Sequence, residues 1–391
     1  MLKKFVSALL IYTLVVGALA PAVLAEEKPA QPVDLTPNAR SAIVLDADTG
    51  TVISEKNADE KLPPASITKI MTMVLVMEAL DQGKLAMDEK VRTSEYAASM
   101  GGSQIFLEVG EEMSVQDMLK GIAMASGNDA SVAMAEKIGG SEQGFVQMMN
   151  DKAKELGMNN TNFVNPNGLP ADNHYTTARD IAIMSRELLK HEEITQFTSV
   201  YQDYLRKDTP KPFWLVNTNK LVRFYPGADG LKTGYTSEAK FCLSATAKRD
   251  NFRVITVVLG EPDTKTRNAE VTKLFDYAFS QYTNQLVVKT GDVLGDVTVK
   301  RGKPEKFQLT AKHQYSVLLK KGEATQDIRH ELKLEPELKA PITAGQPIGK
   351  ILVYKGDQQL AEFPVEAPAN VDKAGWWDML KRTAGHLFFI D

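Results

Sequence analysis

The sequence is poor in the residues that build several common kinds of site. Only one of its 391 residues is cysteine, so the chain can form neither an internal disulfide nor a thiolate-based zinc or iron–sulfur site. Its five histidines show no H-x-x-x-H spacing, which gives no reason to expect a metal. Neither sign of charge dominates, because 46 Lys and Arg stand against 50 Asp and Glu. Without a basic field, nucleic acid is a poor partner. We therefore expect no cofactor, no metal and no nucleic acid.

Long apolar runs are also missing. The longest begins at Phe5 and ends at Ala20, which is short of the ~20 residues that a spanning helix needs. Two lysines precede the run, Pro21 breaks it, and small residues at Val23 and Ala25 form a cleavage pattern. This favours a removed signal peptide over residues 1–25, rather than an uncleaved anchor. No cysteine follows the apolar run, which excludes attachment of a lipid at the N-terminus. Because a signal peptide directs export, the mature chain is expected to work outside the cytoplasm.

The remaining composition is that of a soluble globular protein, with 43% hydrophobic and 25% charged residues. Residues 26–37 are polar and Pro-rich and indicate a linker. Residues 38–284 combine strand and helix patterns, which predict an α+β domain with an antiparallel sheet and helices packed around it. We expect a hairpin over 41–57, strands over 240–247 and 253–259, and helices over 66–80, 114–138, 143–157, 177–190 and 271–282.

The C-terminal third has a different texture. Residues 285–366 alternate short apolar segments with Gly, Pro and charged turns, which is typical of a small all-β domain. Residues 367–391 contain an amphipathic helix, in which Trp376 and Leu380 begin an apolar stripe and the charged side chains lie off it. We predict that this helix lies in a membrane interface. The alternative is a helix docked on the β-rich domain.

Three short motifs occur in order along the α+β region: Ser66-Ile67-Thr68-Lys69, Ser126-Gly127-Asn128 and Lys232-Thr233-Gly234. Each is weak alone, since Ser237-Glu238-Ala239-Lys240 and Lys289-Thr290-Gly291 also fit two of the patterns. Context separates them. The first motif opens an apolar helix, and the third lies just ahead of the strand pair, whereas the duplicates fall in turns.

The chemistry of the first motif is that of an activated nucleophile. A serine hydroxyl needs a neighbouring base to take its proton. Lys69 lies one turn after Ser66, and burial against the apolar helix would lower its pKa enough for that task. The start of the helix also presents backbone N–H groups that suit a developing oxyanion.

The other two motifs supply groups for holding substrate. Ser126 could relay a proton, and the amide of Asn128 could hold a substrate backbone. Lys232 and Thr233 offer a charge and a hydroxyl for an anionic substrate end. Gly234 would let substrate approach the strand closely, because a side chain there would block it.

The three motifs together resemble those of the low-molecular-mass penicillin-binding proteins of the D-alanyl-D-alanine carboxypeptidase type, which are serine peptidases. The resemblance runs from about residue 37 to the C-terminus. It implies a penicillin-binding/β-lactamase-like catalytic domain followed by the small all-β domain and the terminal helix. It rests on the blocks Pro64–Lys69, Ala125–Ala130, Asn165–Leu169 and Asp229–Thr236.

The resemblance also implies an activity, namely removal of the terminal D-alanine from peptidoglycan stem peptides that end in D-Ala-D-Ala. Ser66 would be the acylated nucleophile and Lys69 its general base, with Ser126 and Asn128 assisting proton transfer and substrate binding. β-Lactam antibiotics would acylate Ser66 as well. The place of action would be the outer face of the cytoplasmic membrane, with peripheral attachment through the terminal helix.

The resemblance assigns the third motif to the carboxylate end of the substrate. Lys232 and Thr233 would bind the terminal carboxylate. The backbone N–H groups of Ser66 and Tyr235 would form the oxyanion hole.

Two alternatives remain open. A class A-like β-lactamase would need a glutamate for deacylation, and Glu155 with Asn159 fits the E-x-x-x-N spacing. Glu155 lies in a predicted helix, however, and we interpret it as a solvated residue. A non-catalytic peptidoglycan- or penicillin-binding protein is the second alternative, but it would not need the Ser66–Lys69 pair. His174 and Cys242 are interpreted as structural residues.

Overall fold

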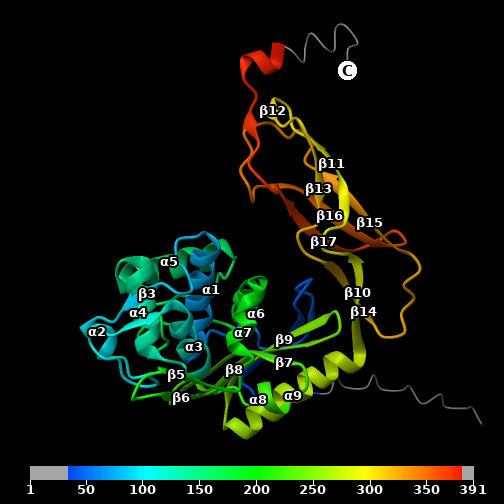
Figure 1. Ribbon diagram of the computed structural model, residues 1–391. Coiled ribbons are helices and arrows are strands. Elements are labelled where there is room, and N and C mark those ends of the chain that lie inside the picture. Colours follow the sequence, from blue (N-terminus) through cyan, green and yellow to red (C-terminus); the bar gives the residue numbers. More distant parts are fainter. Residues whose placement is uncertain (1–33, 381–391) are drawn as a thin grey trace, which may run out of the picture. The chain divides into compact units, whose positions relative to one another are not determined.

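The computed structural model describes residues 34–380 (Figure 1). The predicted signal peptide lies outside the described residues, as do residues 26–33 of the predicted linker and the last part of the predicted C-terminal helix. Within the described residues, no helix is long and apolar enough to cross a membrane.

The α+β region is organised around one antiparallel sheet of five strands in the order β2-β1-β9-β8-β7. The first two strands form the predicted hairpin, in which Ala42 pairs with Lys56. β1 then inserts beside β9, near the end of the region, so the sheet joins the two ends of this part of the chain. The strands are β1 (Ser41–Asp46), β2 (Val52–Lys56), β7 (Ala228–Thr236), β8 (Lys240–Arg249) and β9 (Phe252–Glu261).

Both faces of this sheet are covered, which explains why β1 is buried along its whole length. Ile43 and Leu45 belong to the larger apolar cluster, which includes most of the buried helical residues. Ala42 and Val44 alternate with them and belong to a second cluster with α9 (Thr264–Gln281). Figure 1 shows α9 on one face of the sheet and most of the other helices on the opposite face. α8 (Leu221–Phe224) lies on the α9 side, since Leu221 belongs to the second cluster. The predicted α+β layering is confirmed.

The helices on the opposite face begin and end at recognisable signals. Thr177 caps α6 by accepting a hydrogen bond from the Asp180 N–H, and Ser141 caps α5 in the same way. These helical segments are η1 (Ala65–Thr68), α1 (Lys69–Asp81), α2 (Glu95–Ala98), α3 (Val115–Ala125), α4 (Asn128–Gly139), α5 (Glu142–Glu155), α6 (Ala178–Lys190), η2 (Glu192–Ile194) and α7 (Thr195–Thr198). Two small hairpins accompany them: β3 (Lys90–Arg92) with β4 (Glu112–Ser114), and β5 (Gln202–Leu205) with β6 (Phe213–Val216).

Three expectations about these elements are wrong. The predicted helix over 114–138 is two helices, because Ser126 has a left-handed backbone with φ of 64° and ends α3. The predicted helix over 66–80 starts with a 3₁₀ turn, and its α-helical part begins at Lys69. Lys232 lies within edge strand β7 instead of ahead of the strand pair.

A pair of buried carboxyl groups lies at the end of β9. Glu261 is fully buried, and the carboxyl group of Glu270 is its neighbour. Burial and the neighbouring Glu270 raise the pKa of Glu261 to about 8. Glu270, on α9, accepts hydrogen bonds from the backbone N–H groups of Asn38 and Ala39. Glu270 therefore anchors the segment that leads into β1.

The C-terminal part is rich in short antiparallel strands around its own apolar cluster, which includes Val317, Ile351 and Val365. It contains a three-stranded sheet, β15-β16-β17, and strand pairs β10-β14, β11-β13 and β12-β18. The strands are β10 (Tyr282–Val288), β11 (Val293–Thr298), β12 (Gly302–Lys303), β13 (Lys306–Thr310), β14 (Tyr315–Lys320), β15 (Ile328–Leu334), β16 (Pro347–Lys355), β17 (Gln358–Glu366) and β18 (Asp372–Lys373).

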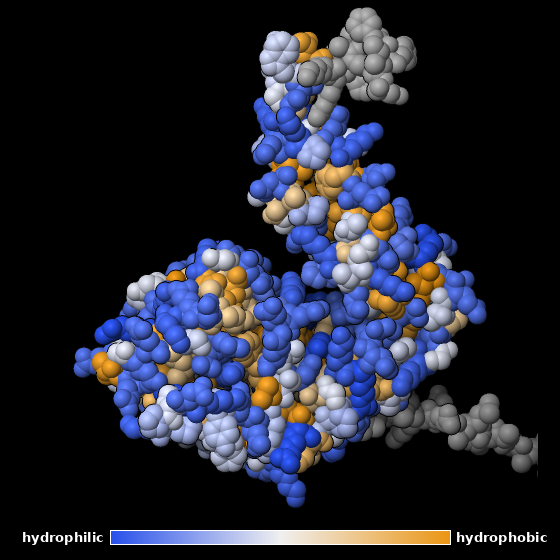
Figure 2. Space-filling model, in the orientation of Figure 1, coloured by the Kyte–Doolittle hydropathy of each residue, from blue (hydrophilic) through white to orange (hydrophobic). Residues whose placement is uncertain are grey.

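The described chain ends in a helical segment at residues 376–380. Trp376 and Trp377 are two-thirds exposed there, and their ring centroids lie 4.3 Å apart. Elsewhere, the face in Figure 2 is mainly hydrophilic, with apolar residues in small separate areas.

Candidate active site

The turn that carries Ser66 is short and strained. Pro64 precedes it, and Ala65 has a left-handed backbone with φ of 47°, which is unfavourable for a residue with a Cβ. The hydroxyl of Thr68 donates to the carbonyl of Ala65 over 2.8 Å and closes the turn. The 3₁₀ geometry places residues three apart on one side, so Lys69 comes to lie beside Ser66.

Lys69 is completely buried at the start of α1. Its Nζ lies 2.6 Å from Asn128 Oδ1, 2.6 Å from the carbonyl oxygen of Asn167 and 3.1 Å from Ser66 Oγ. The first two atoms only accept hydrogen bonds. A neutral amine therefore donates its two N–H groups to them and directs its lone pair at the hydroxyl of Ser66.

The surroundings of Lys69 favour this neutral form. Burial, and then the charge of Lys232, lower its pKa well below the usual range, and Asp129 opposes the shift. The structure therefore brings the predicted nucleophile and base together in the state that general-base catalysis needs.

The second motif lies across from this turn, where α3 ends and α4 begins. The left-handed backbone of Ser126 lets the chain reverse so that Asn128 reaches Lys69. The Nδ2 of Asn128 donates to the carbonyl of Gly101, and its backbone N–H donates to the carbonyl of Ser103. Ser126 is 4% exposed, and its Oγ has no hydrogen-bond partner among residues 34–380. A buried unpaired hydroxyl is costly, which fits the predicted role of Ser126 as a proton relay.

The third motif lies on edge strand β7. Lys232 is fully buried, and its Nζ donates to the carbonyl of Thr233 over 3.1 Å. Burial, and then the charge of Arg267, lower the pKa of Lys232 to about 7. Tyr235 is exposed on the same strand and lies against Phe241, with ring centroids 4.4 Å apart.

Gly234 has a packing role that sequence reasoning did not anticipate. A Cβ on this residue would lie 3.0 Å from the carbonyl oxygen of Pro64 and 3.2 Å from the Cβ of Ala65. The missing side chain therefore allows β7 to pack against the turn that carries Ser66. The expected purpose, close approach of substrate, stays a prediction.

The duplicate motifs do not share these surroundings. Ser237 is exposed in the turn between β7 and β8. Lys289 lies in a turn after β10, where its backbone N–H donates to the Asp292 carboxylate. Glu155, the candidate deacylating glutamate, is 65% exposed on α5 and forms an ion pair with Lys152.

Thr218 is a site residue that the sequence analysis missed. Its hydroxyl accepts a hydrogen bond from the hydroxyl of Thr233 over 2.8 Å. The side chains on either side hold its loop, since Asn217 donates to the carbonyl of Thr198 and Asn219 donates to that of Gly230. The alternating Asn-Thr-Asn pattern was the available signal, because asparagines that flank a residue commonly bond the backbone of a loop.

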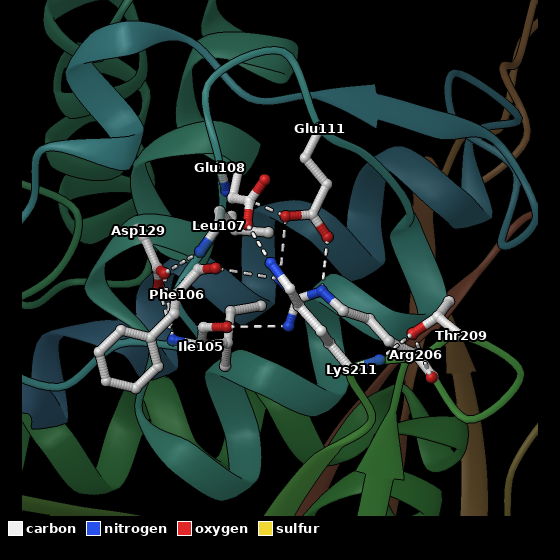
Figure 3. Close-up of polar contacts among 9 residues, drawn as sticks. All are labelled: Ile105, Phe106, Leu107, Glu108, Glu111, Asp129, Arg206, Thr209 and Lys211. Atoms are coloured by element: carbon white, nitrogen blue, oxygen red, sulfur yellow. Dashed lines mark hydrogen bonds and ion pairs between the residues drawn. The ribbon is translucent and has the colours of Figure 1, made fainter.

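The loop that contacts Asn128 is braced by two charged side chains (Figure 3). Asp129 accepts hydrogen bonds from the N–H groups of Ile105 and Leu107. From the other side, Arg206 donates to the carbonyls of Ile105 and Phe106 and forms a two-bond ion pair with Glu111.

This bracing holds Phe106 in an unfavourable conformation. Its backbone is left-handed with φ of 56°, and its side chain is 64% exposed. The ring points away from the Arg206–Glu111 ion pair (Figure 3) and lies edge-on to Phe213, with centroids 5.7 Å apart.

The described residues do not contain a group of three or more His, Cys, Asp or Glu that could hold a metal ion. Cys242 is buried, and burial raises the pKa of its thiol to about 11, which makes it unreactive.

Comparison with known proteins agrees with this arrangement. Residues 25–263 match the model of the family described as D-alanyl-D-alanine carboxypeptidase, and residues 282–373 match that of the penicillin-binding protein 5 C-terminal domain. The chain belongs to the D-alanyl-D-alanine carboxypeptidase family. The resemblance inferred from the three motifs is thus confirmed, and so is the penicillin-binding/β-lactamase-like fold with its all-β C-terminal domain.

Relatives of this carboxypeptidase family member match either most of its length or only part of it. It is 54% identical over 384 residues to the D-alanyl-D-alanine carboxypeptidase DacF of Bacillus subtilis, covering 98% of each chain. Penicillin-binding protein 5 of Haemophilus influenzae has a similar fold, with a TM-score of 0.67 and 31% identity over 86% of this chain and 98% of that one. Penicillin-binding protein D2 of Listeria monocytogenes was solved in an ampicillin-bound form. Its structure matches with a TM-score of 0.56 and 33% sequence identity, covering 62% of this chain and 98% of that one.

Proposed function

We propose that this protein is a serine-type D-Ala-D-Ala carboxypeptidase that works through an acyl-enzyme on Ser66. The observation that supports this most directly is the buried Lys69 amine, whose two donors are taken by Asn128 and Asn167 and whose third position faces Ser66 Oγ at 3.1 Å. The naming of its relatives as carboxypeptidases supports the same activity.

The first half of the reaction forms an ester. Lys69 takes the proton of the Ser66 hydroxyl while Oγ attacks the carbonyl carbon of the penultimate D-alanine. The amide bond to the terminal D-alanine then breaks, and its nitrogen receives the proton held by Lys69, with Ser126 as the relay. Backbone N–H groups of Ser66 and Tyr235 stabilise the oxyanion.

The second half releases the shortened peptide. Water replaces the departed D-alanine, gives a proton to Lys69 and attacks the ester carbon. Lys69 then returns this proton to Oγ as the C–Oγ bond breaks, which restores the Ser66 hydroxyl. Asn128 holds the peptide backbone throughout. Lys232 and Thr233 bind the terminal carboxylate, with Thr218 aligning the hydroxyl of Thr233.

β-Lactams would enter the same half-reaction, because their ring carbonyl and carboxylate match those of the substrate. One relative, penicillin-binding protein D2 of Listeria monocytogenes, was solved in an ampicillin-bound form and in a cefotaxime-bound form. When the β-lactam ring opens, the amine that leaves the carbonyl stays attached to the rest of the molecule and does not make room for water as D-alanine does. The ester on Oγ should therefore hydrolyse more slowly than the peptide ester.

The test is release of D-alanine from a diacyl-Lys-D-Ala-D-Ala peptide by the purified chain and by Ser66→Ala. Ser237→Ala is the matched control, since Ser237 also has a lysine three residues on. We expect release from the wild type and Ser237→Ala and none from Ser66→Ala. Equal release from all three would contradict the proposal. Rapid turnover of benzylpenicillin without a lasting adduct would favour the β-lactamase alternative.

We also propose export and peripheral attachment to the outer face of the cytoplasmic membrane. The pattern of residues 1–25 supports cleavage after Ala25. The exposed Trp376 and Trp377 support an interfacial helix, because tryptophan favours the boundary between lipid and water. Removing residues 371–391 should shift the protein from the membrane to the soluble fraction. Continued membrane binding would place the anchor elsewhere.

A further inference from the structure

His174 is a buried residue beneath the Ser66 turn that the proposed reaction does not use. It is 6% exposed, and its ring lies edge-on to Phe163, with centroids 6.0 Å apart. Burial lowers the pKa of His174 to about 4, so the imidazole is neutral near pH 7. A neutral imidazole has one nitrogen that donates and one that accepts.

The neighbours of His174 determine which nitrogen carries the proton. The backbone N–H of Val164 points at Nδ1 over 3.3 Å, so Nδ1 accepts. The proton is therefore on Nε2, which lies 2.9 Å from the hydroxyl oxygen of Thr68. The hydroxyl proton of Thr68 is used for the carbonyl of Ala65, which leaves its oxygen free to accept from Nε2.

These bonds form one directed chain: Val164 N–H to His174 Nδ1, His174 Nε2–H to Thr68 Oγ1, and Thr68 O–H to the Ala65 carbonyl. Every donor in it has an acceptor. The chain connects the segment before the Asn165–Leu169 block to the turn that contains Ser66.

The turn at the end of this chain needs external support, because Ala65 is held at φ of 47°. A second support comes from Gly168, where a Cβ would lie only 1.8 Å from the carbonyl oxygen of Ala65. The backbone of the Asn165–Leu169 block therefore packs closely against the same carbonyl that Thr68 binds. The orientation of this one peptide group determines the direction in which Ser66 leaves the turn.

We propose that His174 is a positioning residue for Ser66: acting through the hydroxyl of Thr68, it fixes the Ala65 peptide and so the direction of the nucleophile toward Lys69. This inference rests on the proposed role of Ser66 as the acylated residue. Displacing a nucleophile by about 1 Å costs ~100-fold in rate. The binding of substrate before reaction depends on groups that the Val164–His174–Thr68 hydrogen bonds do not touch. Loss of His174 should therefore slow acylation at unchanged affinity.

The experiment measures acylation by benzylpenicillin with rapid mixing, which separates the noncovalent dissociation constant from the acylation rate constant. His174→Phe keeps the ring and removes both hydrogen bonds, and Thr68→Val keeps the shape of Thr68 without its hydroxyl. We expect each to lower the acylation rate constant ~10- to 100-fold while the dissociation constant changes less than about twofold. His174→Gln retains a donor at the position of Nε2 and should recover most of the rate.

Thr161→Val is the matched control. It removes a hydroxyl that is hydrogen-bonded to Thr176 and Asp180 in the same region of the fold. This hydroxyl takes no part in the hydrogen bonds that join His174 to the Ser66 turn. Its acylation rate should equal that of the wild type.

The double variant of His174→Phe and Thr68→Val should be no slower than the slower single variant, because both act through one path. Wild-type rates in His174→Phe and Thr68→Val would overturn the inference and leave the proposed function standing. Absence of acylation in the wild type would instead reject the proposed function.

Discussion

The Nζ of Lys69 lies 3.1 Å from the Oγ of Ser66, and two other acceptors hold the amine in place. To act as the base for Ser66, Lys69 has to be neutral near pH 7. The burial that lowers its pKa is a property of the fold, since the residue is completely enclosed at the start of α1.

The first prediction follows from that requirement. Lys69→Arg should reduce acylation by benzylpenicillin ~10²–10⁴-fold, because a guanidinium stays charged and cannot take the proton. Intact-mass measurement of the adduct over time gives the rate. Lys240→Arg, in the duplicate S-x-x-K pattern, is the control and should react like the wild type. Acylation of Lys69→Arg at the wild-type rate would exclude Lys69 as the base.

The second prediction concerns Lys232, whose pKa burial and Arg267 lower to about 7. The charged form binds the substrate carboxylate, so the second-order rate of acylation should fall as pH rises above about 7. Neutral Lys69 is needed at the same time, which gives a bell-shaped profile. Lys232→Arg keeps its charge and should lose the alkaline fall. An identical alkaline limb in Lys232→Arg would assign that limb to another group.

The third prediction tests the bracing of the loop beside Asn128. Arg206→Ala removes the ion pair with Glu111 and the bonds to the carbonyls of Ile105 and Phe106. We expect a loss of about 2 kcal/mol in unfolding free energy, because charge-assisted bonds of a partly buried pair are lost. KM should rise as well, since the loop holds Asn128, the proposed substrate-binding amide.

Lys211→Ala is the control in the same cluster (Figure 3). Its ion pair with Glu108 joins two side chains that are 85% and 77% exposed, so its loss should leave the melting temperature unchanged. Equal effects of Arg206→Ala and Lys211→Ala would contradict the bracing role.

The fourth prediction concerns the stability of the fold at alkaline pH. Glu261 has a pKa raised to about 8 in the folded state, whereas an unfolded glutamate ionises near 4.3. Between these values the folded state binds the extra proton, so stability falls as pH rises through this window. Glu261→Gln imitates the protonated form and should melt at a higher temperature than the wild type at pH 9.

At pH 4 the wild type is itself protonated, so the two melting temperatures should converge there. Glu155→Gln, at an exposed carboxylate, should show no such pH-dependent difference. A constant offset between Glu261→Gln and the wild type from pH 4 to 9 would contradict the buried-proton explanation.

The motif residues were predictable because residues that act together within a motif are only a few positions apart in the sequence. Ser66 and Lys69 are three residues apart, and the proline pair before them and the apolar helix after them mark their context. The same holds for the hairpin over 41–57, where strand patterns flank Asp48-Thr49-Gly50. Such features need only the period of a helix or strand.

Other features depended on contacts between distant residues. The apolar periodicity continues across Ser126, so it predicts one helix where a left-handed residue divides two. Thr218 reaches the site through a hydrogen bond to Thr233, and His174 reaches the Ser66 turn through Thr68. No local pattern encodes these pairings, because tertiary packing decides which side chains meet.

The complete burial of Lys69 and Lys232 determines how these two amines can be labelled chemically. Amine-reactive reagents dissolved in water meet the exposed lysines and do not reach these two, so heavy labelling of the native protein should leave acylation intact. An electrophile aimed at either lysine has to be delivered by a molecule that first occupies the site. Probes built on a substrate-like carboxylate are therefore better suited to this pair than small reagents selected for reactivity alone.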